Sequence, residues 1–432
     1  MTTVTVAPRH SFGVMRNRDF AVFWAAALVS NSGTWMQTIA VPFVLFEITH
    51  HSTTWLGIGA FMAFFPALAI GPLAGSLADR VSRKRILLAT QSTLMIFAFG
   101  LWGVWIAGLA TPGLIIVLLF FSGLATGVNI AAWQSFVPQL VPSGQLIDAV
   151  RLNSMQFVAA RAFGPAVAGL VLEAWGAGAC FLLNAVTYVL VLAALLAIHP
   201  RTVARDETAG RVVDHFREAV RYVRARRSLL YPVLTITAVS FFASSVVQLA
   251  PAFAKEFSVG RGEYGVLVAM FGGGAILGSV VVGGWGNRTR RSIVVFFGLL
   301  LIVAGQLLLA LAPSYAWGLT GIFTMGVAYL LIATALNTSI QGRVDEMHRG
   351  RAMSIYLMGL LAGVPLGALL QGKLASIVGL GATVAGAAVM LGVLAVAVAV
   401  TRDGFRPLDE VIDDEPGTDL LLNAPPSIAN AD

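Results

Sequence analysis

A short basic sequence occurs twice in this chain of 432 residues, each time directly after an apolar stretch long enough to cross a membrane. Both copies read Gly, any three residues, Asp or Asn, then Arg, and they begin at Gly75 and Gly283. The copies lie 208 residues apart, and Asn129 and Asn337, each inside a later apolar stretch, keep the same separation. Two repeated halves in a membrane chain are typical of transporters in which two similar helical bundles move around a site between them.

The composition places most of the chain in lipid. Hydrophobic residues make up 57% and charged residues 11%, whereas a soluble domain carries about 25% charged residues. Stretches of about 20 apolar residues are long enough for transmembrane helices. Twelve such stretches occur, at 20–46, 55–77, 85–107, 113–135, 152–174, 177–198, 229–253, 264–285, 292–312, 315–338, 352–373 and 378–400. The sequence therefore predicts an all-α integral membrane protein with twelve transmembrane helices in two six-helix bundles.

This pattern divides the chain into four segments. We expect a first six-helix bundle at 1–198, a cytoplasmic linker at 199–228, a second six-helix bundle at 229–400 and a disordered acidic cytoplasmic tail at 401–432. Within the linker, residues 211–227 alternate Val, Phe and Tyr with Arg and Glu. That alternation predicts an amphipathic helix on the membrane surface.

The placement of basic residues predicts the orientation. If the N-terminus is cytoplasmic, 24 of the 28 Lys and Arg residues fall on the cytoplasmic side, whereas Lys255, Arg261 and Lys373 lie outside. Such a bias follows the positive-inside rule, so we expect a multi-pass protein of the cell membrane with both termini in the cytoplasm. Anionic lipid on that side accounts for the net charge of +7 without any nucleic acid.

Motifs of enzymes and metal sites are missing from the sequence. Cys180 is the single cysteine, so it cannot form a disulfide within the chain. Neither a Ser/His/Asp arrangement, a phosphate-binding loop nor an HExxH motif occurs. We expect a non-enzymatic, monomeric protein without metal or cofactor, whose partners are a small-molecule substrate, protons and membrane lipid.

Six-plus-six spans with this basic loop between spans 2 and 3 resemble the major facilitator superfamily. Several segments further resemble the bacterial exporter group that contains siderophore exporters and macrolide-efflux proteins. These segments are Arg18-Asp19-Phe20, Trp35-Met36-Gln37, Phe46-Glu47, Gly164-Pro165 with Gly169, and the Arg-rich stretch Phe216–Arg227. The resemblance implies a secondary active transporter that exports small amphipathic, drug-like or siderophore-like molecules by alternating access, driven by proton antiport.

The repeated basic loop also has an implied role. In the superfamily the acid at the position of Asp79 holds the two halves together on the cytoplasmic side in one state of the cycle. Asn287 lacks the charge, so the second copy would form a weaker latch. The residues of the predicted latch are Gly75, Asp79, Arg80, Arg83, Lys84, Asn287 and Arg288. Alternatively, these bases only set the topology.

Polar and aromatic residues inside the spans are candidates for binding substrate. The resemblance implies that spans 1, 4, 7 and 10 surround a central cavity, and ligand sites combine an apolar lining with a few polar groups. The candidates are Asn31, Trp35, Gln37, Asn129, Trp133, Arg161, Phe241, Ser244, Gln248 and Asn337.

Arg161 is the sharpest of these candidates. It lies nine residues beyond Leu152, or about 14 Å along a helix, near the middle of its span. A charge at that depth is costly and faces a cavity or a partner, and the sequence places no carboxylate at the same depth. Arg161 therefore either meets an anionic or carbonyl-rich substrate or bonds backbone carbonyls that are freed near Pro165.

Gly164, Pro165 and Gly169 in the fifth span, with Pro365 in the eleventh, predict helices that are kinked or closely packed. Gly164-Pro165 also resembles part of a motif found in antiporters of the superfamily, and the two interpretations remain open. Two other functions stay open as well: uptake or facilitated diffusion of a small metabolite, and a non-transporting receptor or assembly protein with the same fold.

Chemical labelling tests the predicted topology. In a Cys180→Ser background, single cysteines placed at Ser82, Thr208 and Thr289 should react only from the cytoplasm, because the basic loops lie there. Cysteines placed at Ser52 and Thr111 should react only from outside. Labelling of both groups from one side of the membrane would rule out the twelve-span topology.

Overall fold

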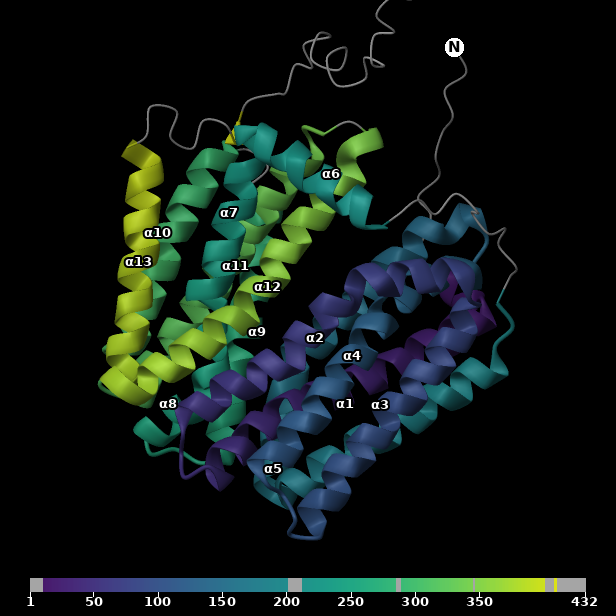
Figure 1. Ribbon diagram of the computed structural model, residues 1–432, viewed down its shortest axis with the longest axis horizontal. Helices are drawn as coiled ribbons and strands as arrows, with labels where there is room; N and C mark the ends of the chain where they lie inside the picture. The colour runs from purple at the N-terminus through teal and green to yellow at the C-terminus, as the bar shows by residue number, and fades with distance from the viewer. Residues whose placement is uncertain (1–10, 201–211, 285–288, 345, 401–407, 410–432) are drawn as a thin grey trace, which may run out of the picture.

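The computed structural model describes residues 11–200, 212–284, 289–344, 346–400 and 408–409, and it describes them as helices joined by short turns (Figure 1). Within these ranges the side chains of 11, 12, 72, 73, 75–80, 162, 212–216, 346 and 347 are left undescribed.

Helices α1 to α5 form one group of the structure (Figure 1). They are α1 (Arg18–Ile48), α2 (Thr53–Arg80), α3 (Arg83–Ile106), α4 (Pro112–Phe136) and α5 (Leu146–Ala197). Short 3₁₀ segments flank them: η1 (Ser11–Arg16), η2 (Val137–Leu140) and η3 (Ser143–Gln145).

Helix α6 (Val212–Ala225) leads into the second group. This group contains α7 (Arg227–Phe242), the 3₁₀ segment η4 (Ser244–Leu249), α8 (Ala250–Glu256), α9 (Arg261–Gly284), α10 (Arg291–Ala310), α11 (Tyr315–Gln341), α12 (Glu346–Val378) and α13 (Leu380–Val400). The four domain ranges expected from the sequence stay a prediction, because 201–211 and most of 401–432 lie outside the described residues.

The described helices confirm the prediction of twelve membrane crossings. Ten helical stretches are long and apolar enough to span a bilayer. One of them, Ser143–Ala197, has 55 residues and contains two crossings, and α1 is absent from the ten. Helix α1 has 31 residues but carries a polar run around Asn31, Thr34 and Gln37, which lowers its mean hydropathy. Dividing α5 and counting α1 gives the twelve spans expected from the sequence.

Gly176 divides α5 into two crossings. Its backbone has φ 77° and ψ −179°, whereas the residues on both sides are helical. That region of φ and ψ is essentially restricted to glycine, because a Cβ would collide with the backbone. One residue therefore turns the chain back into the membrane without a loop.

The packing of the helices follows the same 208-residue repeat as the sequence. Helix α9 begins 208 residues after α2, at Arg261 and Thr53, and α10 begins 208 residues after α3, at Arg291 and Arg83. Helix α2 packs on α4 as α9 packs on α11, and α3 packs on α4 as α10 packs on α11. Between the groups, α2 packs on α12 and α5 packs on α9. The two groups are therefore related by an internal repeat in three dimensions as well as in sequence.

The α6 end is the end of the molecule at which α6 and the starts of α1, α3 and α10 lie, and the far end is opposite, where α1 turns into α2 (Figure 1). Helix α6 packs along α12, where the Arg351 guanidinium donates to Glu218 at 2.8 Å. At the same end, Leu408 is buried and the backbone N–H of Ser292 donates to Asp409 at 3.1 Å. Asp409 thus supplies a carboxylate to the first turn of α10, where the helix dipole favours negative charge.

Replacement of Gly176 should measure the cost of the turn. Gly176→Ala should destabilise the protein by about 1–3 kcal/mol, because alanine must adopt a conformation reserved for glycine. The matched control is Gly103→Ala, since Gly103 lies inside helix α3 with nothing within 4 Å of an added Cβ. Melting temperatures of the detergent-solubilised variants check this, and equal melting points would contradict it.

Candidate functional site

Two glycine crossings join the groups at the far end. A Cβ added to Gly169 of α5 would lie 2.7 Å from the Cα of Gly265 of α9, and one added to Gly372 of α12 would lie 3.0 Å from the Cα of Gly57 of α2. Gly57 and Gly265 are 208 residues apart, so the two crossings use equivalent positions of the repeat. Small residues allow such close approach of membrane helices.

Hydrogen bonds reinforce this closure. The backbone N–H of Gly262 donates to the Glu173 carboxylate at 3.1 Å, and the Tyr264 hydroxyl donates to the Ile39 carbonyl at 3.0 Å. At the other crossing the Thr53 hydroxyl donates to the Gly372 carbonyl at 2.9 Å. Each of these bonds joins one group to the other, so the far end is closed.

The face of α5 that carries Gly169 becomes exposed toward the α6 end. Pro165 and Gly169 are buried against α9, whereas Arg161, Val158 and Ser154 are exposed. All five positions share one face, because they follow the helical spacing of three and four residues. Exposure on that face therefore means that α5 and α9 separate toward the α6 end, and not that this face meets lipid.

Helix α12 shows the same change along its length. Ala368 is completely buried beside Gly57, whereas Leu361 and Leu357, about two and three turns nearer the α6 end on the same face, are 53% and 45% exposed. Since α2 and α12 repeat the relation of α9 and α5, both interfaces are closed at the far end and open at the α6 end.

A chain of amides lies inside the first group. The Asn31 amide of α1 donates to Gln156 of α5 at 3.1 Å, and Gln156 in turn contacts Asn153 at 3.5 Å. The indole N–H of Trp133, from α4, donates to the same Asn153 oxygen at 3.3 Å. Gln156 is buried, and the cluster connects α1, α4 and α5 within the lipid-embedded part of the chain.

Arg161 lies beside this cluster on α5. Its guanidinium carbon is 5.8 Å from the ring centroid of Trp35, within the range of a cation–π contact. Gly164 makes room for the indole, because an added Cβ would lie 2.5 Å from Trp35 Cβ. Within the part of the chain that the structure describes, no carboxylate lies within 4.0 Å of Arg161. Arg161 therefore packs against the Trp35 ring and forms no ion pair with the described carboxylates.

Two other predicted residues are bound to neighbouring helices. The Asn184 amide donates to Gln37 at 2.7 Å, and Asn129 accepts from Thr90 at 3.0 Å and from Gln91 at 3.2 Å. These bonds stay within the first group, and among the described residues neither Gln37 nor Asn129 bonds Arg161 or the amides beside it. Asn337, the repeat counterpart of Asn129, instead accepts from Gln341 of its own helix at 2.6 Å.

The predicted residues of the seventh span surround a break between α7 and η4. The carbonyls of Phe241 and Phe242 lack their helical donors there, and they accept from Gln371 and Gln306, each at 2.7 Å. Both glutamines are buried, and Gly367 allows α12 to approach the Phe241 carbonyl. Ser244 is buried and Gln248 is half-buried, and Pro365 is buried inside α12.

The sequence profile of the transmembrane secretion effector family, within the major facilitator superfamily, matches residues 9–420. The chain belongs to this family. Its members are transporters and not enzymes, and the chain is accordingly a multi-pass membrane transporter of small molecules.

Individual members of this and related families are only distantly similar. The staphyloferrin A transporter of Staphylococcus aureus is 25% identical, over 83% of this chain and 90% of its own. The macrolide efflux protein A of Streptococcus pyogenes is 23% identical, over 83% and 90%. An enterobactin exporter of Escherichia coli is 25% identical, over 82% and 85%.

Solved structures agree in fold. The nucleoside transporter NupG superposes with a TM-score of 0.71 at 13% identity, over 88% of this chain and 99% of that one. A bacterial homolog of the lysosomal transporter Spinster, solved inward-facing and unoccupied, gives 0.69 at 16% identity, over 90% and 97%. At these identities the comparison supports the fold alone.

The predicted latch of this transporter is only partly within the described residues. The side chains of Gly75, Asp79 and Arg80 and all of Asn287 and Arg288 lie outside them. Lys84 donates to the carbonyl of Ile198 at 2.7 Å, which caps the end of α5 within the first group. The latch therefore stays a prediction.

Sequence reasoning missed the partners of the amide chain and of the helix break. Asn153, Gln156, Gln306 and Gln371 are amide side chains inside predicted membrane spans. That placement was the available signal, because an amide in lipid must find a hydrogen-bond partner.

Cross-linking can test the glycine closure. The hydroxyls of Thr54 and Ser376 are 3.0 Å apart across the far end, so Thr54→Cys with Ser376→Cys, in a Cys180→Ser background, should form a disulfide on oxidation. Adding Gly169→Ala should reduce its yield, because overpacking disfavours the closed far end by about 1–3 kcal/mol.

Gly103→Ala is the control and should leave the yield unchanged. Equal cross-linking in Gly169→Ala and the parent would show that the crossing of α5 and α9 does not hold the far end shut.

Proposed function

We propose that this transporter exports small amphipathic, drug-like or siderophore-like molecules by alternating access, coupled to the proton gradient. The observation that carries the proposal is the α5 face that is buried at Gly169 and exposed at Arg161. A face that is buried at one end and open at the other is what two rocking bundles require. The distant relatives that export macrolides or enterobactin support the export direction.

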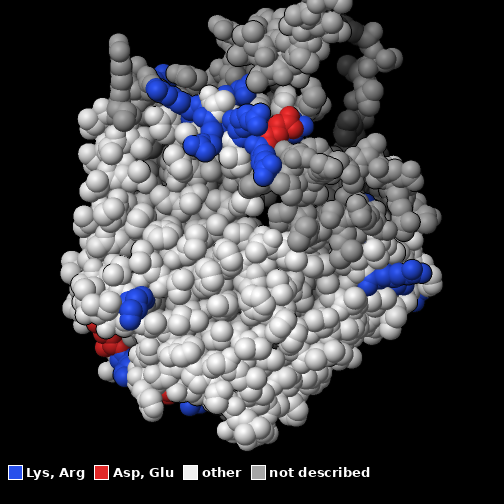
Figure 2. Space-filling view, in the orientation of Figure 1, with Lys and Arg blue, Asp and Glu red and all other residues white. Residues whose placement is uncertain are grey.

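The proposed orientation places the α6 end in the cytoplasm. Lys and Arg side chains gather over this end on the face shown in Figure 2, above a broad surface without charge. Basic residues favour the cytoplasmic side. The structure then corresponds to an inward-open state, in which substrate enters from the cytoplasm and the far end is shut toward the outside.

Arg161 and Trp35 form the centre of the proposed substrate site, with the Asn31 and Gln156 amides beside them. The guanidinium supplies planar hydrogen-bond donors to a carboxylate or a polarised carbonyl, and the indole supplies apolar contact area. A cation without a mid-depth acid among the described residues favours an anionic or carbonyl-rich substrate over a cationic one.

The latch at Asp79 is proposed to act in the opposite state. In the inward-open state the two groups diverge at the α6 end, and Lys84 bonds within its own group. Closing the α6 end would bring Asp79, Arg80 and Arg83 toward the second group, whereas Asn287 would contribute less because it has no charge.

Substitution of Arg161 separates a substrate role from a structural one. Arg161→Lys should keep the melting temperature and slow efflux of an acidic compound about tenfold, because lysine lacks the planar fork. Arg161→Met should abolish that efflux yet leave the melting temperature unchanged or higher. Efflux of a basic compound should fall much less in both variants.

Arg151→Met is the matched control, since Arg151 is exposed on the same face of α5 nearer the α6 end. It should affect both compounds little. A falling melting temperature in Arg161→Met with equal loss for acidic and basic compounds would show that Arg161 only stabilises the helix near Pro165.

A further inference from the structure

A pocket lies at the far end, and Arg161 is not among the residues that line it. It has a volume of about 300 Å³ and lies between the ends of α1 and α3, the turn of α5 and the start of α9. Its apolar wall includes Phe43, Trp102, Trp105 and Trp175, and its two charged residues are Glu47 and Arg261. A pocket of this size and lining is in the range of small ligand sites.

The tryptophans place this pocket at the membrane surface. Trp102 and Trp105 lie in the last turns of α3, which ends at Ile106, and Trp175 precedes the turn at Gly176. Tryptophan side chains concentrate at the interface between hydrocarbon and headgroups. Trp175 is 73% exposed, so one wall of the pocket faces the surrounding lipid.

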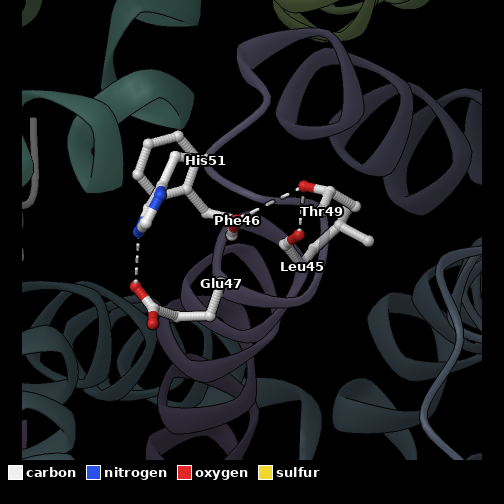
Figure 3. Close-up of polar contacts among 5 residues, drawn as sticks. All are labelled: Leu45, Phe46, Glu47, Thr49 and His51. Atoms are coloured by element: carbon white, nitrogen blue, oxygen red, sulfur yellow. Dashed lines mark hydrogen bonds and ion pairs between the residues drawn. The ribbon is translucent and has the colours of Figure 1, made fainter.

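The two charges of the pocket are not paired with each other. The guanidinium carbon of Arg261 is 5.5 Å from the Phe43 ring centroid, and no carboxylate of the described residues lies within 4.0 Å of its nitrogens. Glu47 instead faces His51, with 3.4 Å between its Oε1 and the imidazole Nε2 (Figure 3).

A tight turn fixes that carboxylate. His50 and His51 have φ of 53° and 68°, and the His51 N–H donates to the Phe46 carbonyl at 2.8 Å. Figure 3 shows Thr49 bonding back to Leu45 beside it, at 2.6 Å. A fixed carboxylate and a separate guanidinium thus share one apolar pocket.

We propose that this pocket binds the headgroup of an outer-leaflet phospholipid that carries a primary ammonium group. The Arg261 guanidinium binds its phosphate, and the Glu47 carboxylate binds its ammonium group. Its glycerol and the first carbons of its acyl chains pack against the tryptophans. Guanidinium matches phosphate through several donors in one plane. An anionic headgroup without an ammonium would leave Glu47 repelling the phosphate, and a quaternary ammonium cannot donate a hydrogen bond to it.

Occupancy of this site depends on the state of the transporter. Arg261 belongs to α9, whereas the rest of the lining belongs to α1, α3 and α5. The bonds that hold Arg261 beside Phe43 are those of the closed far end, at Gly262 and Tyr264. A bound lipid that bridges the two groups therefore stabilises the inward-open state. This step rests on the proposed alternating access, whereas lipid binding itself does not.

Native mass spectrometry tests the binding. The intact transporter is equilibrated with equal amounts of phosphatidylethanolamine, phosphatidylcholine and phosphatidylglycerol, and the retained lipid is compared with this mixture. Phosphatidylethanolamine should be enriched, and Arg261→Gln should weaken its retention about tenfold. Glu47→Gln should still retain phospholipid but no longer prefer phosphatidylethanolamine to phosphatidylglycerol.

Lys373→Gln is the matched control, since Lys373 is an exposed cation near the end of α12, outside the pocket. It should behave as the parent does, and a melting temperature taken in phosphatidylglycerol confirms that each variant is folded. Equal retention of phosphatidylethanolamine by Arg261→Gln and Lys373→Gln would overturn the site.

The same lipids test the effect on conformation. Phosphatidylethanolamine should raise the yield of the disulfide between cysteines introduced at Thr54 and Ser376 relative to phosphatidylglycerol, and Arg261→Gln should remove that difference. An unchanged yield despite enriched lipid would refute the stabilisation of the closed far end. Arg161→Met should leave lipid retention intact, so a failure of the proposed transport function is distinguishable from a failure of this site.

Discussion

The architecture depends on close backbone contact at two places, where Gly169 meets Gly265 and Gly57 meets Gly372. Apolar side chains gain little by leaving lipid for another helix, so membrane helices associate through packing and hydrogen bonds that require close approach. Because Gly57 and Gly265 are equivalent positions of the repeat, one packing solution serves both interfaces. Because the two groups touch closely at these crossings near the far end, they can separate at the α6 end. That geometry allows one group to rock against the other.

The two halves satisfy their polar groups in different ways despite the repeat. In the first half the amides of Asn31 and Gln156 bond each other across continuous helices. In the second half the corresponding helix is broken after Phe242. There the side-chain amides of Gln306 and Gln371 donate to the carbonyls at the break. Both arrangements meet the same requirement, because backbone and side-chain polar groups in lipid must be satisfied internally. The first places Arg161 beside its amides, whereas no cation contacts Gln306 or Gln371 among the described residues, so the proposed site is asymmetric.

The sequence predicted the number and approximate limits of the crossings, since hydropathy and length determine them. It also placed Arg161 near the middle of the fifth span, with no carboxylate at the same depth. It could not predict which polar residues would meet each other, because spacing along one helix does not specify the neighbouring helix. Asn129 and Asn337 show this, because they occupy equivalent positions of the repeat. Asn129 accepts hydrogen bonds from Thr90 and Gln91, whereas Asn337 accepts one from its own helix. The Glu47 and Arg261 pocket was invisible for the same reason, because its walls come from four helices that are far apart in the chain.

The positions of the acids limit how the proposed proton coupling can work. Among side chains that the structure describes, the carboxylates of the membrane helices, such as Asp148, Glu173 and Glu263, lie near helix ends. The proposed proton coupling therefore has carboxylates available at the ends of the described helices and none beside Arg161. Glu173 accepts from the backbone N–H of Gly262 across the closed far end. This carboxylate therefore helps to hold the far end closed, whereas the proposed substrate site contains a cation and, among the described residues, no acid within 4.0 Å of it.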